Sequence, residues 1–204
     1  MERYSDLDLD DPRIVSILDD LPLWSAPFGL RLLETVEYRR GLQVLDLGSG
    51  TGFPLATLAA RLGRGCRVTG LDPWLGAARR GRQRIAVTKL ANAAVVAGRG
   101  EDLPFREAVF DLIVSNNGIN NVDDAGRVLG ECARVARPGA QFVVTVNLPG
   151  TMSVFYDRFR ETVRELGLED AVAAIDAHIH RHRRHAGETV SYTHLRAHET
   201  VLDL

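Results

Sequence analysis

Short apolar runs alternate with segments whose apolar residues recur at helical spacing along most of this 204-residue chain. The run at 110–115 is apolar at almost every position, as expected of a strand that is buried on both faces. Such strands occur where helices cover both sides of a parallel sheet, so the pattern predicts an α/β fold with a doubly wound parallel sheet. We expect its strands at 43–47, 66–71, 93–97, 110–115 and 140–146.

Helical spacing fills the intervals between these runs and continues on both sides of them. Within the sheet region we expect helices at 53–62 and 74–90, and a third that Asp123 or Asp124 caps and Arg137-Pro138-Gly139 ends. Further helical segments are predicted at 11–38, 152–166 and 169–184. The predicted organisation is a helical preface or lid at 1–40, an α/β core at 41–150, and C-terminal helices of the same domain at 151–189.

Composition narrows the class of protein. The chain is 45% hydrophobic and 25% charged, with a formal net charge of −2, so no electrostatic attraction to nucleic acid is expected. No apolar run is long enough to span a membrane, and the acidic residues 1–11 do not resemble a secretory signal. Cys66 and Cys132 fit reduced thiols. We therefore expect a cytoplasmic protein.

The most specific motif is Asp46-Leu-Gly48-Ser49-Gly50-Thr51-Gly52, which follows the first predicted strand. Glycines at alternate positions let the backbone approach a ligand closely. A dinucleotide fingerprint fails because Phe53 stands where its third glycine should be, and no Gly-Lys-Ser/Thr follows as in a phosphate-binding loop. The start of the next helix offers free N–H groups to a carboxylate.

This acid-x-Gly-x-Gly-x-Gly pattern resembles motif I of the class I S-adenosylmethionine-dependent methyltransferases, whose fold is Rossmann-like. Four later segments resemble the family's motifs in the same order: Asp72-Pro73, 100–105, 110–115 and 134–140. Within the family the chain is most similar to the ubiquinone/menaquinone-biosynthesis, or type 11, subgroup. The resemblance implies a methyltransferase that uses S-adenosylmethionine and releases S-adenosylhomocysteine.

The resemblance also implies roles for individual residues. Asp46 would hold the methionyl amino end, and Asp72 would accept hydrogen bonds from the ribose hydroxyls; Asp72 could instead form only a turn before Pro73. Arg99 departs from the family, which often has an acid there facing the adenine amino group. The predicted cofactor-binding residues are Asp46, Gly48, Ser49, Gly50, Thr51, Gly52, Asp72, Pro73, Gly100, Glu101, Asp102, Leu103 and Asn116.

Residues on the acceptor side are harder to identify, and no catalytic residue is predicted. Asn117, Asn120 and Asn121 can orient a substrate but cannot titrate, and they could equally satisfy their own turns. Trp24 and Phe28 are lid candidates, although core packing would look the same. No metal site is expected, because arginines surround the histidine pair His178 and His182.

Two readings of function therefore compete. The first is methyl transfer to a small organic acceptor, with no nucleic-acid partner and no membrane segment. The second is a cofactor-binding or regulatory module without catalysis, which the lack of a titratable residue near Asn120 keeps open. A third use of the same fold, aminopropyl transfer or RNA methylation, also stays open. The sequence does not predict an oligomeric state.

The last residues require separate treatment. Residues 190–200 read Val-Ser-Tyr-Thr-His-Leu-Arg-Ala-His-Glu-Thr, which resembles the translation of a transposase-type sequencing adapter. We therefore expect 190–204 to be a non-native tail and the natural chain to continue beyond Thr189. The family fold ends with two further strands, so the chain is expected to lack that final pair. The fifth strand would then be an uncovered edge, and the chain poorly soluble or inactive.

Overall fold

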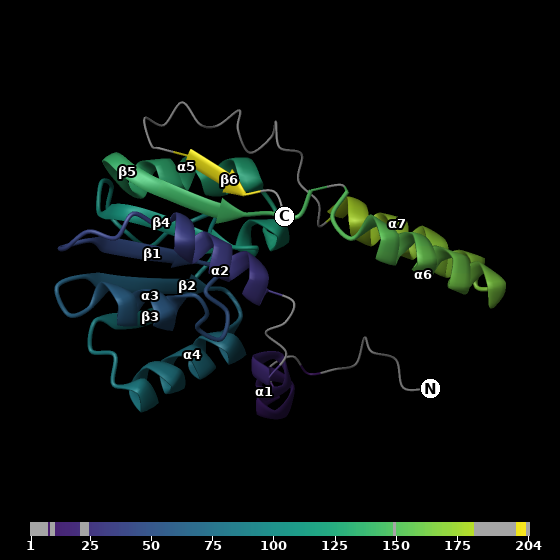
Figure 1. Ribbon diagram of the computed structural model, residues 1–204, viewed down its shortest axis with the longest axis horizontal. Helices are drawn as coiled ribbons and strands as arrows, with labels where there is room; N and C mark the ends of the chain where they lie inside the picture. The colour runs from purple at the N-terminus through teal and green to yellow at the C-terminus, as the bar shows by residue number, and fades with distance from the viewer. Residues whose placement is uncertain (1–7, 9–10, 21–24, 149, 182–198, 203–204) are drawn as a thin grey trace.

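The computed structural model describes residues 8, 11–20, 25–148, 150–181 and 199–202, and a parallel sheet lies at its centre. The strand order is β3-β2-β1-β4-β5-β6, and every pair of neighbours is parallel (Figure 1). This confirms the predicted α/β class. The strands are β1 (Gln43–Leu47), β2 (Arg67–Asp72), β3 (Ala93–Ala97), β4 (Phe110–Asn116), β5 (Ala136–Thr145) and β6 (Glu199–Leu202).

Helices cover both faces of the sheet, because successive strand residues point to opposite sides. On one face Val44 and Val68 pack with Leu32, Leu55 and other residues of α2 (Ala26–Thr35), α3 (Leu55–Leu62) and α4 (Leu75–Thr88). On the other face the buried side of α5 (Ala125–Val135) packs against alternate residues of the same strands. The crossovers therefore leave every strand from β1 to β4 with its carboxyl end at one edge.

Several predicted boundaries shift for local reasons. The preface divides into α1 (Pro12–Asp20) and α2, and the lid candidate Trp24 lies outside the described residues. Residues 51–54 form a turn, so α3 begins at Leu55 with Pro54 as its N-cap. Asp124 caps α5, its side chain accepting a hydrogen bond from the Arg127 N–H at 2.9 Å.

The strand β5 begins four residues earlier than predicted. Residues 137–139, expected to end the helix, lie within β5 after α5 has ended at Val135. Gly139 has a φ of 79°, and the pairing with β4 shifts register between Phe110 and Leu112. A bulge of this kind absorbs extra residues without breaking the strand.

The outer edge of β5 differs from the prediction. The backbone of β6 pairs in parallel with β5, from Phe142 opposite Glu199 to Thr145 opposite Leu202. The expectation of an uncovered β5 edge is therefore wrong, while the expected poor solubility or inactivity stays a prediction. The adapter-like origin of 190–204 stays a prediction, and residues 190–198 lie outside the described part of the chain.

A helical hairpin follows β5 and projects away from the sheet (Figure 1). It consists of α6 (Ser153–Glu165) and α7 (Glu169–Arg181), which enclose a small core of their own around Tyr156, Val163, Val172 and Ile175. Among the described residues, no helix is both long and apolar enough to cross a membrane.

Candidate functional site

A cavity of about 700 Å³ opens at the carboxyl ends of β1, β2 and β4. The strand order reverses here, because β2 lies on one side of β1 and β4 lies on the other, and open α/β sheets bind ligands at such a point. The lining combines predicted and unpredicted residues. It comprises Ser25, Leu47, Gly48, Gly50, Leu71, Asp72, Pro73, Trp74, Arg99, Gly100, Glu101, Asn116, Asn117, Gly118, Asn121, Val122 and Asp123.

The three glycines of the loop after β1 have different surroundings. All have positive φ, 73° at Gly48, 51° at Gly50 and 104° at Gly52. A Cβ on Gly48 would lie 2.7 Å from the Cα of Gly118, so this glycine lets two loops touch. A Cβ on Gly50 would meet no protein atom within 4 Å, which leaves room for a ligand. Gly52 faces α4 and does not line the cavity.

Asp72 joins the glycine loop to the cavity wall. Its Oδ2 accepts a hydrogen bond from the Gly50 N–H at 2.8 Å, and its Oδ1 accepts one from the Trp74 N–H at 2.9 Å. Burial raises the pKa of this carboxyl, and the two backbone donors act in the opposite direction. Each oxygen keeps a lone pair for a further donor, so the carboxylate can bind a diol.

Charged side chains form the rim beside Gly100. The Arg99 guanidinium pairs with Asp123 at 2.5 Å and with Glu101 at 3.5 Å. The pKa of Arg99 is raised, first by its hydrogen bond to Asp123 and then by the charge of Glu101. Arg99 therefore interacts with the acids of its own rim. With Asp72, the lining has three carboxylates and one guanidinium, which favours a cationic ligand.

Two predicted residues of the same segment lie elsewhere. Asp102 is exposed and does not line the cavity. Leu103 is buried in the hydrophobic core on the α5 side, and its N–H donates to Glu131 Oε2 at 2.8 Å. Leu103 therefore does not line the cavity, whereas Pro73 does.

The asparagine-rich turn after β4 borders the opposite wall. Asn116 Nδ2 donates to the Ser25 carbonyl at 3.2 Å, and its Oδ1 accepts from Thr145 Oγ1 at 2.9 Å. Asn120 is buried and its Oδ1 accepts from the Asn147 N–H at 3.1 Å, so it supports the turn and does not line the cavity. Asn117 lines the cavity, and its buried Nδ2 has no hydrogen-bond partner among the described residues.

Asp46 lies beneath the glycine loop and outside the cavity lining. It is fully buried, and neither carboxylate oxygen has a hydrogen-bond partner in the described part of the chain; the Ser49 hydroxyl is buried in the same way. Burial raises the pKa of Asp46 to about 7, and the charge of Asp72 adds to the rise, while the Leu55 backbone N–H partly offsets it. Thr51 does not line the cavity either.

This burial predicts a specific pH dependence of stability. The folded chain holds the Asp46 proton up to about pH 7, whereas the unfolded chain releases it near pH 4. The contribution of Asp46 to the free energy of unfolding therefore falls as the pH rises from about 4 to about 7, and it is constant above pH 7. We expect Asp46→Asn to gain stability relative to the native chain between pH 5 and pH 8, by about 3 kcal/mol at most. Urea unfolding at pH 5 and pH 8 measures the free energy of unfolding of both proteins. A difference between variant and native chain that is the same at both pH values would contradict the prediction.

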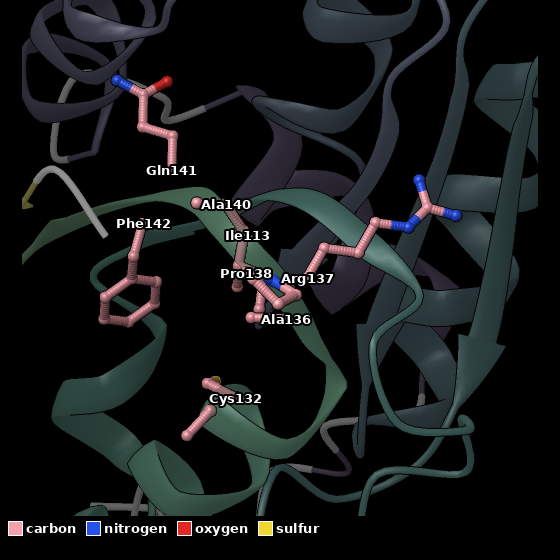
Figure 2. Close-up of a pocket in the computed structure, with 10 residues that line it drawn as sticks. Ile113, Cys132, Ala136, Arg137, Pro138, Ala140, Gln141 and Phe142 are labelled. Carbon is pink, nitrogen blue, oxygen red and sulfur yellow. The ribbon is translucent and has the colours of Figure 1, made fainter. Parts of the chain in front are cut away.

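A second cavity, of about 190 Å³, lies between α5 and β5, away from the glycine loop. Figure 2 shows Cys132 of α5 below it and Phe142 of β5 at its side, while the side chains of Gln141 and Arg137 are directed away. Burial raises the pKa of the Cys132 thiol to about 12, so the thiol stays protonated and is a poor nucleophile. This cavity offers no chemistry for catalysis.

The remaining lid candidate, Phe28, lies beside the main cavity and does not line it. It borders a groove of about 450 Å³ between α2 and the start of α6. Pro27, Leu30 and Met152 also line this groove, and Ser25, two residues before Pro27, lines the main cavity. Several residues of the main cavity were not predicted, and of these only Gly118, a glycine within a polar turn, was recognisable from the sequence. The others are Ser25, Leu47, Leu71, Trp74, Val122 and Asp123.

Comparison with known proteins places these features in a family. A methyltransferase-domain model matches residues 45–144. A demethylmenaquinone methyltransferase from Listeria monocytogenes is 31% identical over 139 residues, covering 66% of this chain and 59% of that protein. The corresponding protein from Corynebacterium kroppenstedtii is 38% identical over 104 residues, covering 51% and 41%. The chain thus spans between 41% and 59% of the length of these two relatives.

A solved structure supports the same assignment. A SAM-dependent methyltransferase from Aquifex aeolicus superposes with a TM-score of 0.59 at 24% identity, covering 66% of this chain and 71% of that one. At this identity the likeness shows the fold. The methyltransferase-domain match and the order of the motifs around the cavity assign residues 45–144 to the class I S-adenosylmethionine-dependent methyltransferase family.

Proposed function

We propose that the chain binds S-adenosylmethionine in the 700 Å³ cavity and transfers its methyl group to a small organic acceptor. The observation that carries this proposal is the Asp72 carboxylate, which is joined to the Gly50 N–H and borders a cavity with an excess of carboxylates. The residues fit the cofactor, because its sulfonium and ammonium groups are cationic and the space beside Gly50 is free of protein atoms.

Each wall of the cavity has a proposed task. Asp72 accepts the ribose hydroxyls, and Glu101 with the backbone at Gly100 borders the adenine side. Asn117 supplies its unpartnered Nδ2 as a hydrogen-bond donor, and Asn116 meets the methionyl end. Asp46 acts from beneath the loop, at a distance from the ligand, and carries a negative charge only above about pH 7.

When bound, the cofactor supplies a methyl group on a positively charged sulfur, a good leaving group for in-line displacement. The protein's contribution is then chiefly to hold the acceptor close and aligned. The titratable side chains that line the described cavity are Asp72, Arg99, Glu101 and Asp123, and three of these are joined in the rim ion pairs. The site therefore suits an acceptor that is nucleophilic without a dedicated base.

The groove beside the cavity supports an apolar acceptor. Pro27, Phe28, Leu30 and Met152 give it a mostly apolar wall between α2 and α6. The curated relatives are named for demethylmenaquinone, whose reduced ring is an electron-rich aromatic. We therefore assign a quinol-like aromatic as the acceptor class.

The free, buried cysteines support the proposed cytoplasmic location.

Transfer of label from methyl-labelled S-adenosylmethionine to a soluble naphthoquinol tests this function. We expect labelled product from the native chain and a decrease of at least tenfold for Met152→Asp, which places a charge in the apolar groove. Calorimetric titration with S-adenosylhomocysteine tests the cofactor site alone. Binding without transfer to any quinol would favour the cofactor-binding module without catalysis, and no binding would refute both.

A further inference from the structure

Positive charge is concentrated in one part of the chain. Residues 38–98 hold ten of the 25 Lys and Arg residues but two of the 27 acids. Those two acids are both buried, Asp72 in the wall of the main cavity and Asp46 beneath the glycine loop. The exposed charges of this segment are therefore all positive, although the whole chain has a net charge of −2.

The fold brings many of these cations to the amino-terminal edge of the sheet. Cys66 Sγ donates to the Arg39 carbonyl at 3.4 Å, which joins the turn before β1 to the turn before β2. Asn92 Nδ2 donates to the Gly63 carbonyl at 2.9 Å, which joins the turn before β3 to both. We call the resulting surface the basic edge; it consists of Arg39, Arg40, Arg61, Arg64, Arg67 and Lys89.

Protein acids do not neutralise the basic edge within the described residues. All six side chains belong to exposed residues, and none forms an ion pair there. Arg61 lies 6.0 Å from the Tyr38 ring centroid and donates to its hydroxyl at 3.2 Å. Like charges held together repel one another, and an anionic surface relieves this repulsion.

We propose that the basic edge docks the protein on the surface of an anionic phospholipid membrane. Clusters of four to eight Lys and Arg residues bind such surfaces through their phosphate groups. Two further side chains favour a membrane over nucleic acid. Val87, in the last turn of α4 next to Lys89, is 80% exposed, and Tyr38 is a residue type that favours the membrane–water interface. Protein grooves that bind single-stranded nucleic acid combine positive charge with aromatic rings on which the bases stack. Here Arg61 lies over the ring of Tyr38, so this face of the ring is not free for a base.

The edge lies opposite the cofactor cavity, at the other ends of the same strands. The α6–α7 hairpin projects from the carboxyl side, so a protein docked by its basic edge keeps the hairpin away from the membrane (Figure 1). Docking is then a separate property from cofactor binding, and either can be lost without the other.

Co-sedimentation with vesicles of phosphatidylglycerol mixed with phosphatidylcholine tests the proposal. We expect binding at low salt that is lost at about 0.5 M salt, because screening shortens the range of the attraction. The variant Arg64→Gln/Arg67→Gln/Lys89→Gln should bind about 100-fold more weakly. Pure phosphatidylcholine vesicles should bind neither protein.

A matched triple variant controls for the loss of three charges. Arg13→Gln/Arg158→Gln/Arg164→Gln removes three arginines that lie outside the basic edge, and we expect its vesicle binding to stay within about threefold of native. Equal weakening by both triples would overturn the proposal, as would native binding that is indifferent to phosphatidylglycerol. Tight binding to duplex RNA, without vesicle binding, would replace it with a nucleic-acid surface.

Discussion

Asp72→Ala is expected to weaken S-adenosylmethionine binding about 100-fold. The carboxylate is proposed to accept two ribose hydroxyls, and each hydrogen bond to a charged group contributes about 1.5 kcal/mol or more. The substitution also removes the hydrogen bonds that the carboxylate accepts from the Gly50 N–H at 2.8 Å and from the Trp74 N–H at 2.9 Å. Isothermal titration with S-adenosylmethionine and S-adenosylhomocysteine gives the two dissociation constants directly.

Asp102→Ala is the matched control, since Asp102 is an exposed acid that does not line the cavity. Its affinity for both ligands should stay within about twofold of native. The ribose assignment fails if Asp72→Ala and Asp102→Ala bind equally well. Circular dichroism at the titration temperature shows whether each variant is folded.

Gly48→Ala is expected to destabilise the fold by about 3 kcal/mol. The new methyl group would lie 2.7 Å from the Gly118 Cα, a backbone atom that cannot rotate away. The φ of 73° adds the cost of a left-handed conformation, of order 1 kcal/mol for alanine. Urea unfolding followed by fluorescence measures the change in the free energy of unfolding.

Gly50→Ala separates stability from binding at the neighbouring position. Its φ is 51°, but its Cβ would meet no protein atom within 4 Å, so the loss should be about 1 kcal/mol. The same methyl group would enter the space proposed for the cofactor and lower affinity at least tenfold. If Gly48→Ala and Gly50→Ala lower the free energy of unfolding equally, the contact with Gly118 does not contribute to the loss.

The strands and the cofactor loop were predictable because their signals are local. The apolar runs predicted both ends of β1 and β3 correctly. The spacing of Gly48, Gly50 and Gly52 excluded the dinucleotide-binding and phosphate-binding motifs. The direction of each side chain was not predictable from the motif. Leu103 follows Gly100 closely in sequence but packs into the α5 side of the core, and Asp46 lies beneath the loop while Asp72 borders the cavity.

The clustering of positive charge on the surface was not predictable from the sequence, for a different reason. Net charge sums over the chain, and the acids outside residues 38–98 cancel the arginines within them. Only the fold shows that the turns containing Arg39, Arg64 and Lys89 meet at one edge. The expectation of no nucleic-acid partner, which was drawn from the net charge, stays a prediction, but it rested on an average that the surface does not follow.

The hydrogen bond from Gly50 to Asp72 has a kinetic consequence. Because this 2.8 Å contact joins two groups of the chain itself, a ligand spends little free energy on ordering the loop. Association should then resemble docking to a preorganised surface, with a single-exponential approach whose rate rises in proportion to ligand concentration. Differences in affinity among cofactor analogues would then arise mainly in their dissociation rates, and so in their residence times.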